Sequence, residues 1–225
     1  MAIGVTFRNT AGPAKGQAVA VMNRSPHSIF YRCSLEGYQD TLYAHSSQQF
    51  YRECDIRGTV DSIFGSALAV FQDCDILARR PRRGQSNMVT AQGREDADHF
   101  SGFSFINCTV DAAPDLLAAD FQVQTYLGRP WKPYATTVVM QSYLGAAIAP
   151  AGWREWDDKD SLRTLYYGEY ENHGPRADTS RRVDWPGFKL MNSTQALDFT
   201  VGNMIHGDTW LPDTDIPFFS GLLES

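Results

Sequence analysis

The chain has 225 residues, of which 12% are aromatic and 20% charged, so its composition is that of a folded domain and not of a disordered segment. Its formal net charge of −6 argues against a nucleic-acid partner, because binding to phosphate needs clustered Lys and Arg. No apolar run approaches the roughly 20 residues of a membrane-spanning helix, so we expect no membrane partner. The length favours one domain over residues 1–225.

The N-terminal stretch MAIGVTFRNTAG (1–12) reads as a strand already under way. It has neither a basic n-region nor a long apolar h-region, so it is not a secretory signal peptide. We therefore expect a chain whose natural beginning is absent.

A short pattern then recurs along the chain: an aromatic residue, two residues, a cysteine, one residue and an aliphatic residue. It is present in FYRCSL (30–35), YRECDI (51–56), FQDCDI (71–76) and FINCTV (105–110), and FRNTAG (7–12) places Thr10 where the others have cysteine. The anchoring aromatics, from Phe7 through Phe30, Tyr51 and Phe71 to Phe105, are 23, 21, 20 and 34 residues apart. A period of about 20 residues is typical of one coil of a solenoid.

The residue types favour strands, and the offset of three between the aromatic and the cysteine requires a bend within each segment. We therefore predict an all-β fold, a parallel β-helix in which aromatic, cysteine and aliphatic ladders fill the interior. The alternative is an antiparallel β-sandwich with a coincidental motif. The step of 34 leaves room for an inserted loop at RRPRRGQSN (79–87). After residue 140 the pattern is not clear, and we expect loops and short helices packed outside the solenoid.

Two aspartates share one position in this repeat. Asp40 lies in EGYQDTLY (36–43) and Asp61 in GTVDSIFG (58–65), and each follows its cysteine by seven residues. Adjacent coils pair like strands, roughly 4.8 Å apart, so the two carboxylates should lie one above the other. Pro81 has this phase on the next coil, so the ladder of acids ends after two. Stacked carboxylates divide into a protonated acid and an ionised base or nucleophile. The alternative is a pair of exposed turn aspartates.

Neighbouring polar and aromatic residues add to this pair. Gln39 precedes Asp40, and Gln17, ten residues after Phe7, should lie almost in phase with it, so two amides are placed to donate to a developing oxyanion. In YLGRPWKP (126–133), Arg129 and Trp131 are two residues apart on a strand-like segment and thus on one face. The arginine is suited to hold one aspartate ionised, and the tryptophan to stack on a sugar ring.

No Cys or His spacing matches a metal site, so we expect no bound zinc or other metal at these residues. Cysteines in phase on adjacent coils lie within the range of a disulfide. Either Cys54–Cys74 or Cys33–Cys54 is bonded, or the cysteines form an inward ladder of free thiols.

The sequence as a whole resembles the plant pectin methylesterases, carbohydrate esterases with a right-handed parallel β-helix. The motifs are VTFRNTAG, GYQDTLY, FYRECDIRGTVDSIFG, NMVTAQGR, LGRPW, AGWREW and FTVGNMIHGDTWLPDTDIPFFSGL. The resemblance implies hydrolysis of methyl-esterified galacturonate in pectin, with methanol released and no cofactor. It also implies an extracellular, cell-wall location, a monomer, and a proteinaceous pectin methylesterase inhibitor as a further partner.

Carried onto this chain, the resemblance implies that Asp61 is the nucleophile and that Asp40 acts first as general acid and then as general base. Gln17 and Gln39 would stabilise the oxyanion. Arg129 would orient Asp61, and Arg129 and Trp131 would contact the sugar, together with Gln17.

The chain departs from the family pattern in two ways. Ser62 replaces the phenylalanine of VDFIFG, which suggests the loss of a cleft aromatic. The family domain also has more chain before VTFRNTAG, so we expect a shortened chain with an uncapped first coil. Two other functions remain open: a different β-helix polysaccharide enzyme, either a glycosidase or a lyase, and a non-catalytic pectin- or inhibitor-binding member of the family.

Overall fold

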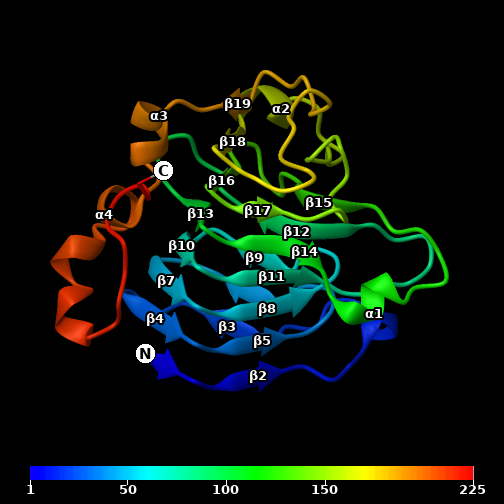
Figure 1. Cartoon of the computed structure of the whole chain (residues 1–225), viewed down its shortest axis with the longest axis horizontal. Coiled ribbons are helices and arrows are strands. Elements are labelled where there is room, and N and C mark those ends of the chain that lie inside the picture. The colour runs from blue at the N-terminus through cyan, green and yellow to red at the C-terminus, as the bar shows by residue number, and fades with distance from the viewer. Residues whose placement is uncertain (225) are drawn as a thin grey trace.

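The computed structural model describes residues 1–224 and contains three parallel sheets that run along one solenoid (Figure 1). The first sheet, sheet A, has eight strands in the order β1 (Ala2–Ile3), β4 (Ser28–Tyr31), β7 (Gln48–Arg52), β10 (Leu68–Gln72), β13 (Gly102–Ile106), β16 (Thr136–Met140), β18 (Tyr166–Tyr170) and β19 (Phe188–Leu190). Sheet B has six, in the order β17 (Tyr143–Leu144), β14 (Thr109–Ala112), β11 (Asp75–Ala78), β8 (Asp55–Gly58), β5 (Ser34–Glu36) and β2 (Thr6–Arg8). Sheet C has five, in the order β15 (Thr125–Gly128), β12 (Asn87–Gln92), β9 (Ile63–Gly65), β6 (Leu42–Ala44) and β3 (Val21–Asn23). The predicted parallel β-helix is confirmed, and the sandwich alternative is wrong.

The central coils contribute one strand to each sheet, and the register preserves the ladders. Phe30, Tyr51, Phe71 and Phe105 are partners along sheet A, and Tyr51, Phe71 and Phe105 stack face to face with ring centroids 4.6 Å apart. Buried aliphatic residues form the matching ladder of sheet B. These ladders fill the inside of the solenoid and make up its main core.

A sharp corner joins sheet A to sheet B in each coil. The residue before the cysteine, or before Ser142 and Asn172 in later coils that lack the cysteine, has a positive φ, a region that residues other than glycine seldom adopt. Such residues are Arg32, Glu53, Asp73, Asn107, Gln141 and Glu171. In the first five the backbone N–H donates to a carbonyl of the next coil at 2.8–3.1 Å, so the stacking of coils holds the corner. This is the bend that the offset of three required.

All four cysteines are buried free thiols, which agrees with the ladder of free thiols and not with either disulfide. Cys54, Cys74 and Cys108 each direct Sγ toward a carbonyl of the preceding coil.

The first coil has a different register from the predicted one. Phe7 pairs with Leu35 in sheet B, and Ala2 pairs with Phe30 in sheet A. Phe7 therefore occupies the aliphatic position, and Thr10 is not a counterpart of the cysteines. The coil is longer than the two that follow it, because η1 (Pro13–Lys15) lies between β2 and β3.

The solenoid also continues beyond residue 140, contrary to expectation. Val139 pairs with Phe105, and Leu144 pairs with Val110, so β16 and β17 extend sheets A and B. In these coils other residues replace the aromatic and the cysteine of the pattern, so the repeat could not be recognised in the sequence. The coils are separated by insertions that contain α1 (Pro114–Leu117) and α2 (Ser161–Thr164).

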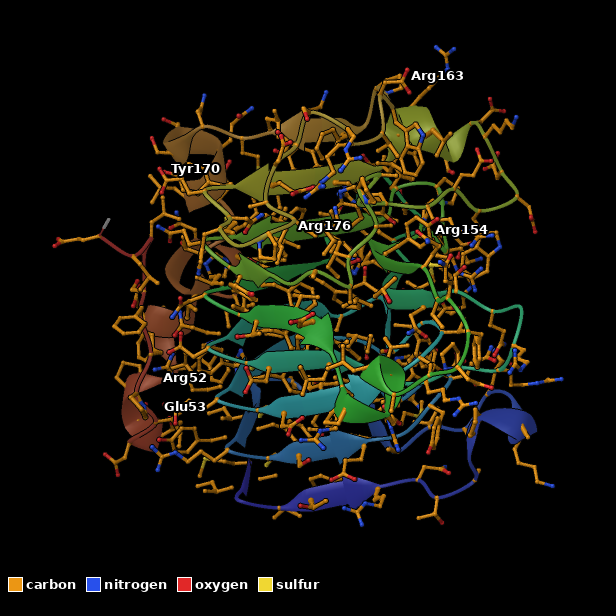
Figure 2. The ribbon with its side chains drawn as sticks, turned by 45° about the vertical axis from the view of Figure 1, so that its right-hand side comes forward. Arg52, Glu53, Arg154, Arg163, Tyr170 and Arg176 are labelled. Atoms are coloured by element: carbon orange, nitrogen blue, oxygen red, sulfur yellow. The ribbon has the colours of Figure 1, made fainter. Side chains whose placement is uncertain are left out.

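The expected short helices cover the outer face of sheet A (Figure 1). They are α3 (Ser193–Leu197), α4 (Val201–Met204), η2 (Gly207–Thr209) and η3 (Pro212–Thr214). Their side chains bury the outward residues of sheet A, such as Phe50 and Val70, in a second core. Figure 2 shows Arg52 and Glu53 on the side of the solenoid that these helices cover. The Arg52 guanidinium lies 5.2 Å from the centroid of the Phe219 ring. No helix within residues 1–224 is long and apolar enough to cross a membrane.

Candidate active site

Asp40 and Asp61 lie at the turns that lead from sheet B into sheet C on neighbouring coils. The Asp40 N–H donates to the Val60 carbonyl at 3.0 Å, and Leu42 pairs with Ile63 directly afterwards, so the two aspartates are in register. Adjacent parallel strands are about 4.8 Å apart, and this sets the separation of the two backbones. The exposed-turn alternative is wrong, because only 6% of each residue is accessible to solvent.

Both aspartates have a left-handed backbone, with φ of 62° for Asp40 and 51° for Asp61. Aspartate tolerates this region better than most residues, but at a conformational cost. Costly backbone conformations concentrate at functional sites, where neighbouring structure imposes them. The same distortion on two successive coils directs both side chains out of the solenoid.

Arg129 binds Asp61 through two parallel hydrogen bonds. Its Nε lies 2.8 Å from Asp61 Oδ1, and its Nη2 lies 2.7 Å from Oδ2. The guanidinium also stacks on Trp156, with 3.7 Å from Cζ to the ring centroid. Arg129 follows β15, and its N–H donates to the Thr90 carbonyl of β12, so the solenoid fixes it. The carboxylate is thereby held in one orientation.

Asp40 has a less favourable environment for a negative charge. Its Oδ2 accepts one hydrogen bond, from Gln17 Nε2 at 2.9 Å, and its buried Oδ1 has no partner within the described chain. Burial, together with the nearby charge of Asp61, raises the pKa of Asp40 to about 6. The pair thus divides into an acid that keeps its proton up to about pH 6 and a carboxylate that is bound by an arginine.

The two glutamines differ in how they lie relative to the cavity. The Ala18 N–H donates to the Gln39 carbonyl at 3.1 Å, which sets Gln17 beside Gln39. The sequence placed Gln17 nearly in phase with Gln39 by counting from Phe7, but Phe7 pairs in sheet B and is not the equivalent of Phe30. The two glutamines are aligned all the same, because η1 and its flanking glycines adjust the length of the first coil. Gln17 faces the cavity at the acids. Gln39 is half-buried, and among the described residues it is not part of the cavity wall.

A small cavity of about 130 Å³ opens beside the two acids. Its wall consists of Gln17, Asp40, Asp61, Phe64, Ala91, Trp131 and Trp156. Trp131 is 37% exposed, and its N–H donates to the Gln92 carbonyl, so β12 fixes it two residues beyond Arg129 as the spacing indicated. Tyr43 stacks on Phe64 at 4.4 Å, which extends the aromatic surface away from the acids.

Comparison with known proteins identifies the family. A sequence profile of the pectinesterase family matches residues 1–208. The chain belongs to the pectinesterase family. It is 60% identical over 225 residues to a probable pectinesterase/pectinesterase inhibitor 47 of Arabidopsis thaliana, covering 100% of this chain and 36% of that protein. The chain therefore spans about a third of the length of the curated relatives that it matches.

Two solved pectin methylesterases share the fold. The enzyme from carrot is 54% identical with a TM-score of 0.94, and the match covers 96% of this chain and 68% of that one. The enzyme from Aspergillus niger is 33% identical with a TM-score of 0.80, and the match covers 95% and 64% of the two chains.

The structure corrects two sequence expectations about this pectinesterase site. Ser62 does not line the cleft: it is 4% exposed, and its Oγ donates to the Thr59 carbonyl at 3.1 Å. Its replacement of phenylalanine therefore changes packing beneath the site, and the cleft keeps its aromatic at Phe64. Pro81 is not in phase with Asp61, because the loop between β11 and β12 displaces it; Thr90 pairs with Ile63, which places Met88 above Asp61.

The sequence analysis missed Trp156 and Phe64. Trp156 belongs to a distant segment that reaches the site because Gly128 pairs with Trp153, and the Arg154 N–H donates to the Gly128 carbonyl at 3.0 Å. In the sequence, Trp156 was part of the family motif AGWREW, but the motif did not indicate a role for this residue. Phe64 had a local signal, since it alternates with the inward Ile63 and Gly65 along β9.

Proposed function

We propose that this chain removes methyl groups from methyl-esterified galacturonate units of pectin and releases methanol. The observation that carries the proposal is the in-register pair of acids, of which Asp61 is held by Arg129 and Asp40 is buried beside it. Family membership and the aromatic cleft support a sugar-ester substrate. One domain over residues 1–225 accounts for all these elements.

In the first half-reaction, a carboxylate oxygen of Asp61 attacks the ester carbonyl, and its other oxygen remains on Arg129. The negative charge moves to the carbonyl oxygen, and we assign its amide N–H donors to Gln17, which lines the cavity, and to Gln39 on the neighbouring coil. The C–O bond to the methoxy group then breaks, and Asp40 gives its proton to the leaving oxygen, so methanol departs. The product is an acid anhydride between Asp61 and the galacturonate.

In the second half-reaction, the ionised Asp40 takes a proton from water, which attacks the anhydride. The bond to Asp61 breaks, the galacturonate leaves as a free acid, and both aspartates return to their starting states. The pKa of Asp40 near its working range suits a group that donates and then accepts one proton. Protein groups perform each step, and Trp131 and Trp156 hold the sugar beside them.

The location and the partners of the protein are inferred from the same proposed function. We place the protein in the plant cell wall, where pectin is found, and we expect it to act as a monomer. A proteinaceous pectin methylesterase inhibitor is a further partner consistent with the family. The non-catalytic alternative loses support because Asp40, Asp61, Arg129 and both glutamines are all present, and all of them except Gln39 are joined by side-chain hydrogen bonds, Gln17 to Asp40 and Arg129 to Asp61.

The deciding experiment measures methanol released from highly methylated pectin by the wild type and by Asp61→Asn. We expect the variant to lose turnover by at least about 10⁴-fold, because it removes the nucleophile. Asp75→Asn is the matched control, since Asp75 is an exposed acid on the coil that follows Asp61. Equal rates for wild type and Asp61→Asn would refute the mechanism. Chain shortening without methanol would instead indicate a glycosidase or lyase, and pectin binding without methanol a non-catalytic protein.

A further inference from the structure

The inward ladder of sheet A reaches a carboxylate inside the solenoid. Phe105 pairs with Val139, and Val139 pairs with Glu169 of β18, so Glu169 has the place that aromatic and aliphatic residues have in earlier coils. Its side chain is 2% exposed. An apolar residue here would continue the core without the cost of removing a charge from water. This carboxylate therefore has a role other than filling the core.

Glu169 has three side-chain hydrogen bonds, all from buried groups. Arg182 donates from Nε to Oε1 at 2.7 Å and from Nη2 to Oε2 at 3.0 Å, and the indole Nε1 of Trp153 donates to Oε1 at 3.1 Å. The Arg182 side chain is 1% exposed. It also donates to three backbone carbonyls, those of Pro150, Arg176 and Asp178. The charged pair is thus fully bonded, and it fixes the Trp153 ring.

We propose that Glu169 and Arg182 are positioning residues for the hydrolysis of the ester. Through Trp153 they hold the segment that keeps the Arg129 guanidinium in place on Asp61. The inference rests on the proposed function and extends it to residues that lie inside the solenoid, away from the cavity wall.

Backbone pairing joins Trp153 to the strand that ends beside Arg129. Trp153 is the bridge partner of Gly128 at the end of β15. On one side of it the Leu127 N–H donates to the Gly152 carbonyl at 2.7 Å, and on the other the Arg154 N–H donates to the Gly128 carbonyl at 3.0 Å. A shift of Trp153 would therefore move the end of β15 or break its pairing.

The chain beside Trp153 is shaped to fit the charged pair. Gly152 has a φ of 71°, and a Cβ added there would collide with the Arg182 side chain. Glycine is suited to this place both by its backbone and by its lack of a side chain. Two successive residues, Gly152 and Trp153, are thus in direct contact with the Glu169–Arg182 pair.

Trp156 depends on the same segment. The Arg129 guanidinium lies over its ring, with 3.7 Å from Cζ to the centroid. Among residues 1–224, the backbone of residues 155–157 makes no hydrogen bond, so Trp156 is placed by the paired residues just before it. Loss of the anchor at Trp153 would therefore disturb both supports of the guanidinium, the end of β15 and the stacked indole.

The first test removes the N–H that Glu169 accepts. Trp153→Phe loses this hydrogen bond but keeps a ring on Tyr167, with which the indole stacks at 4.2 Å. Trp210→Phe is the matched control, because its indole donates to the Ile205 carbonyl at 3.0 Å in the second core. We expect kcat for methanol release to fall about tenfold in Trp153→Phe and to be unchanged in Trp210→Phe. A wild-type kcat in folded Trp153→Phe would overturn the inference.

A double variant separates positioning from general damage to the fold. If Trp153 acts through Arg129, its substitution should cost less than about twofold in kcat once Arg129→Lys has removed the paired hydrogen bonds to Asp61. The same loss of about tenfold in both backgrounds would mean that Trp153 acts by another route, and would overturn the proposal.

A second pair of substitutions tests the charges themselves. Replacing a buried ion pair by apolar residues of similar volume is often neutral for stability. Glu169→Met combined with Arg182→Met should therefore keep a melting temperature near that of wild type, and yet lower kcat as Trp153→Phe does. A stable protein of this kind with the kcat of wild type would show that the pair does not position Arg129.

A measurement without substrate keeps this inference apart from the proposed reaction. The Arg129 Nε–H donates to Asp61 and gives an NMR signal that is assigned by its loss in Arg129→Lys. We expect Trp153→Phe to speed the exchange of this proton with water at least about tenfold, and Trp210→Phe not to. If wild type releases no methanol, the proposed reaction fails, and this exchange rate still decides the positioning role. Equal exchange in wild type and Trp153→Phe would refute it.

Discussion

Arg129 donates two hydrogen bonds to Asp61, whereas Asp40, at the equivalent place on the preceding coil, accepts one from an uncharged amide. The two aspartates share their turn and their left-handed backbone, so local structure cannot distinguish them. The difference comes from a residue 68 positions beyond Asp61 in the chain. One long-range contact thus supports the proposed roles of Asp61 as the nucleophile and Asp40 as the acid.

Arg129→Lys should keep the positive charge but lose the paired hydrogen bonds to Asp61. We expect kcat to fall about 100-fold, because a misdirected carboxylate attacks poorly, while KM changes much less. Steady-state methanol release measures both. Arg80→Lys is the control, since Arg80 pairs with Asp120 on the exposed loop. An unchanged kcat would show that charge alone, without orientation, is sufficient.

The rate should depend on the protonation of Asp40. The group must begin as an acid, and its pKa is raised to about 6, so kcat/KM should decline as pH rises through that value. Bound substrate excludes water and raises this pKa further, so the corresponding limb of kcat should lie at higher pH. Rates measured from about pH 4.5 to about pH 8.5 test this. A kcat/KM that keeps rising across the range would contradict the assignment of Asp40 as the acid.

Asp40→Asn should stabilise the folded protein at neutral pH while inactivating it. The pKa of Asp40 rises from 3.8 to about 6 on folding, so between these values the folded state holds more protons than the unfolded state. The free energy of unfolding of the wild type therefore falls as pH rises through this window. The variant lacks this loss, and we expect it to be about 1–3 kcal/mol more stable at pH 7 and unchanged near pH 3.5.

Urea unfolding at both pH values measures this difference, with Asp75→Asn as the control for removing an exposed acid. A variant that is less stable than wild type at pH 7 would mean that ionised Asp40 is well accommodated, against its buried and unpartnered Oδ1.

The cysteine ladder should be unreactive in the native protein. Burial raises the pKa of the Cys33 and Cys74 thiols, and only the thiolate attacks a disulfide reagent. We expect no thiol to react near pH 8 before unfolding, and Cys33, Cys54, Cys74 and Cys108 all to react in guanidinium without reductant. A smaller number after unfolding would show that disulfides form.

Local sequence was sufficient where the repeat is regular. The spacing from Cys33 to Asp40 equals that from Cys54 to Asp61, and because backbone pairing preserves such phases, the two acids could be predicted to meet. Prediction from residue spacing failed where the length of a coil changes. Phe7 was assigned to the wrong sheet because η1 lengthens the first coil, and Pro81 because a loop follows β11.

The rest depends on tertiary contacts that no local pattern encodes. Trp156 reaches Arg129 only because its segment pairs with the end of β15. Ser62 could not be placed, because the left-handed φ of Asp61 shifts the alternation of inward and outward side chains along the following strand.

The corner between sheet A and sheet B has a consequence for how such solenoids evolve. Gly4 adopts it in the first coil, but five residue types other than glycine adopt it in the coils that follow, so hydrogen bonds from the adjacent coil hold the conformation whatever the residue. A duplicated coil would therefore acquire its corner from the coil on which it stacks. We therefore expect related solenoids to gain or lose whole coils at their ends, while the two coils that contain Asp40 and Asp61 remain unchanged.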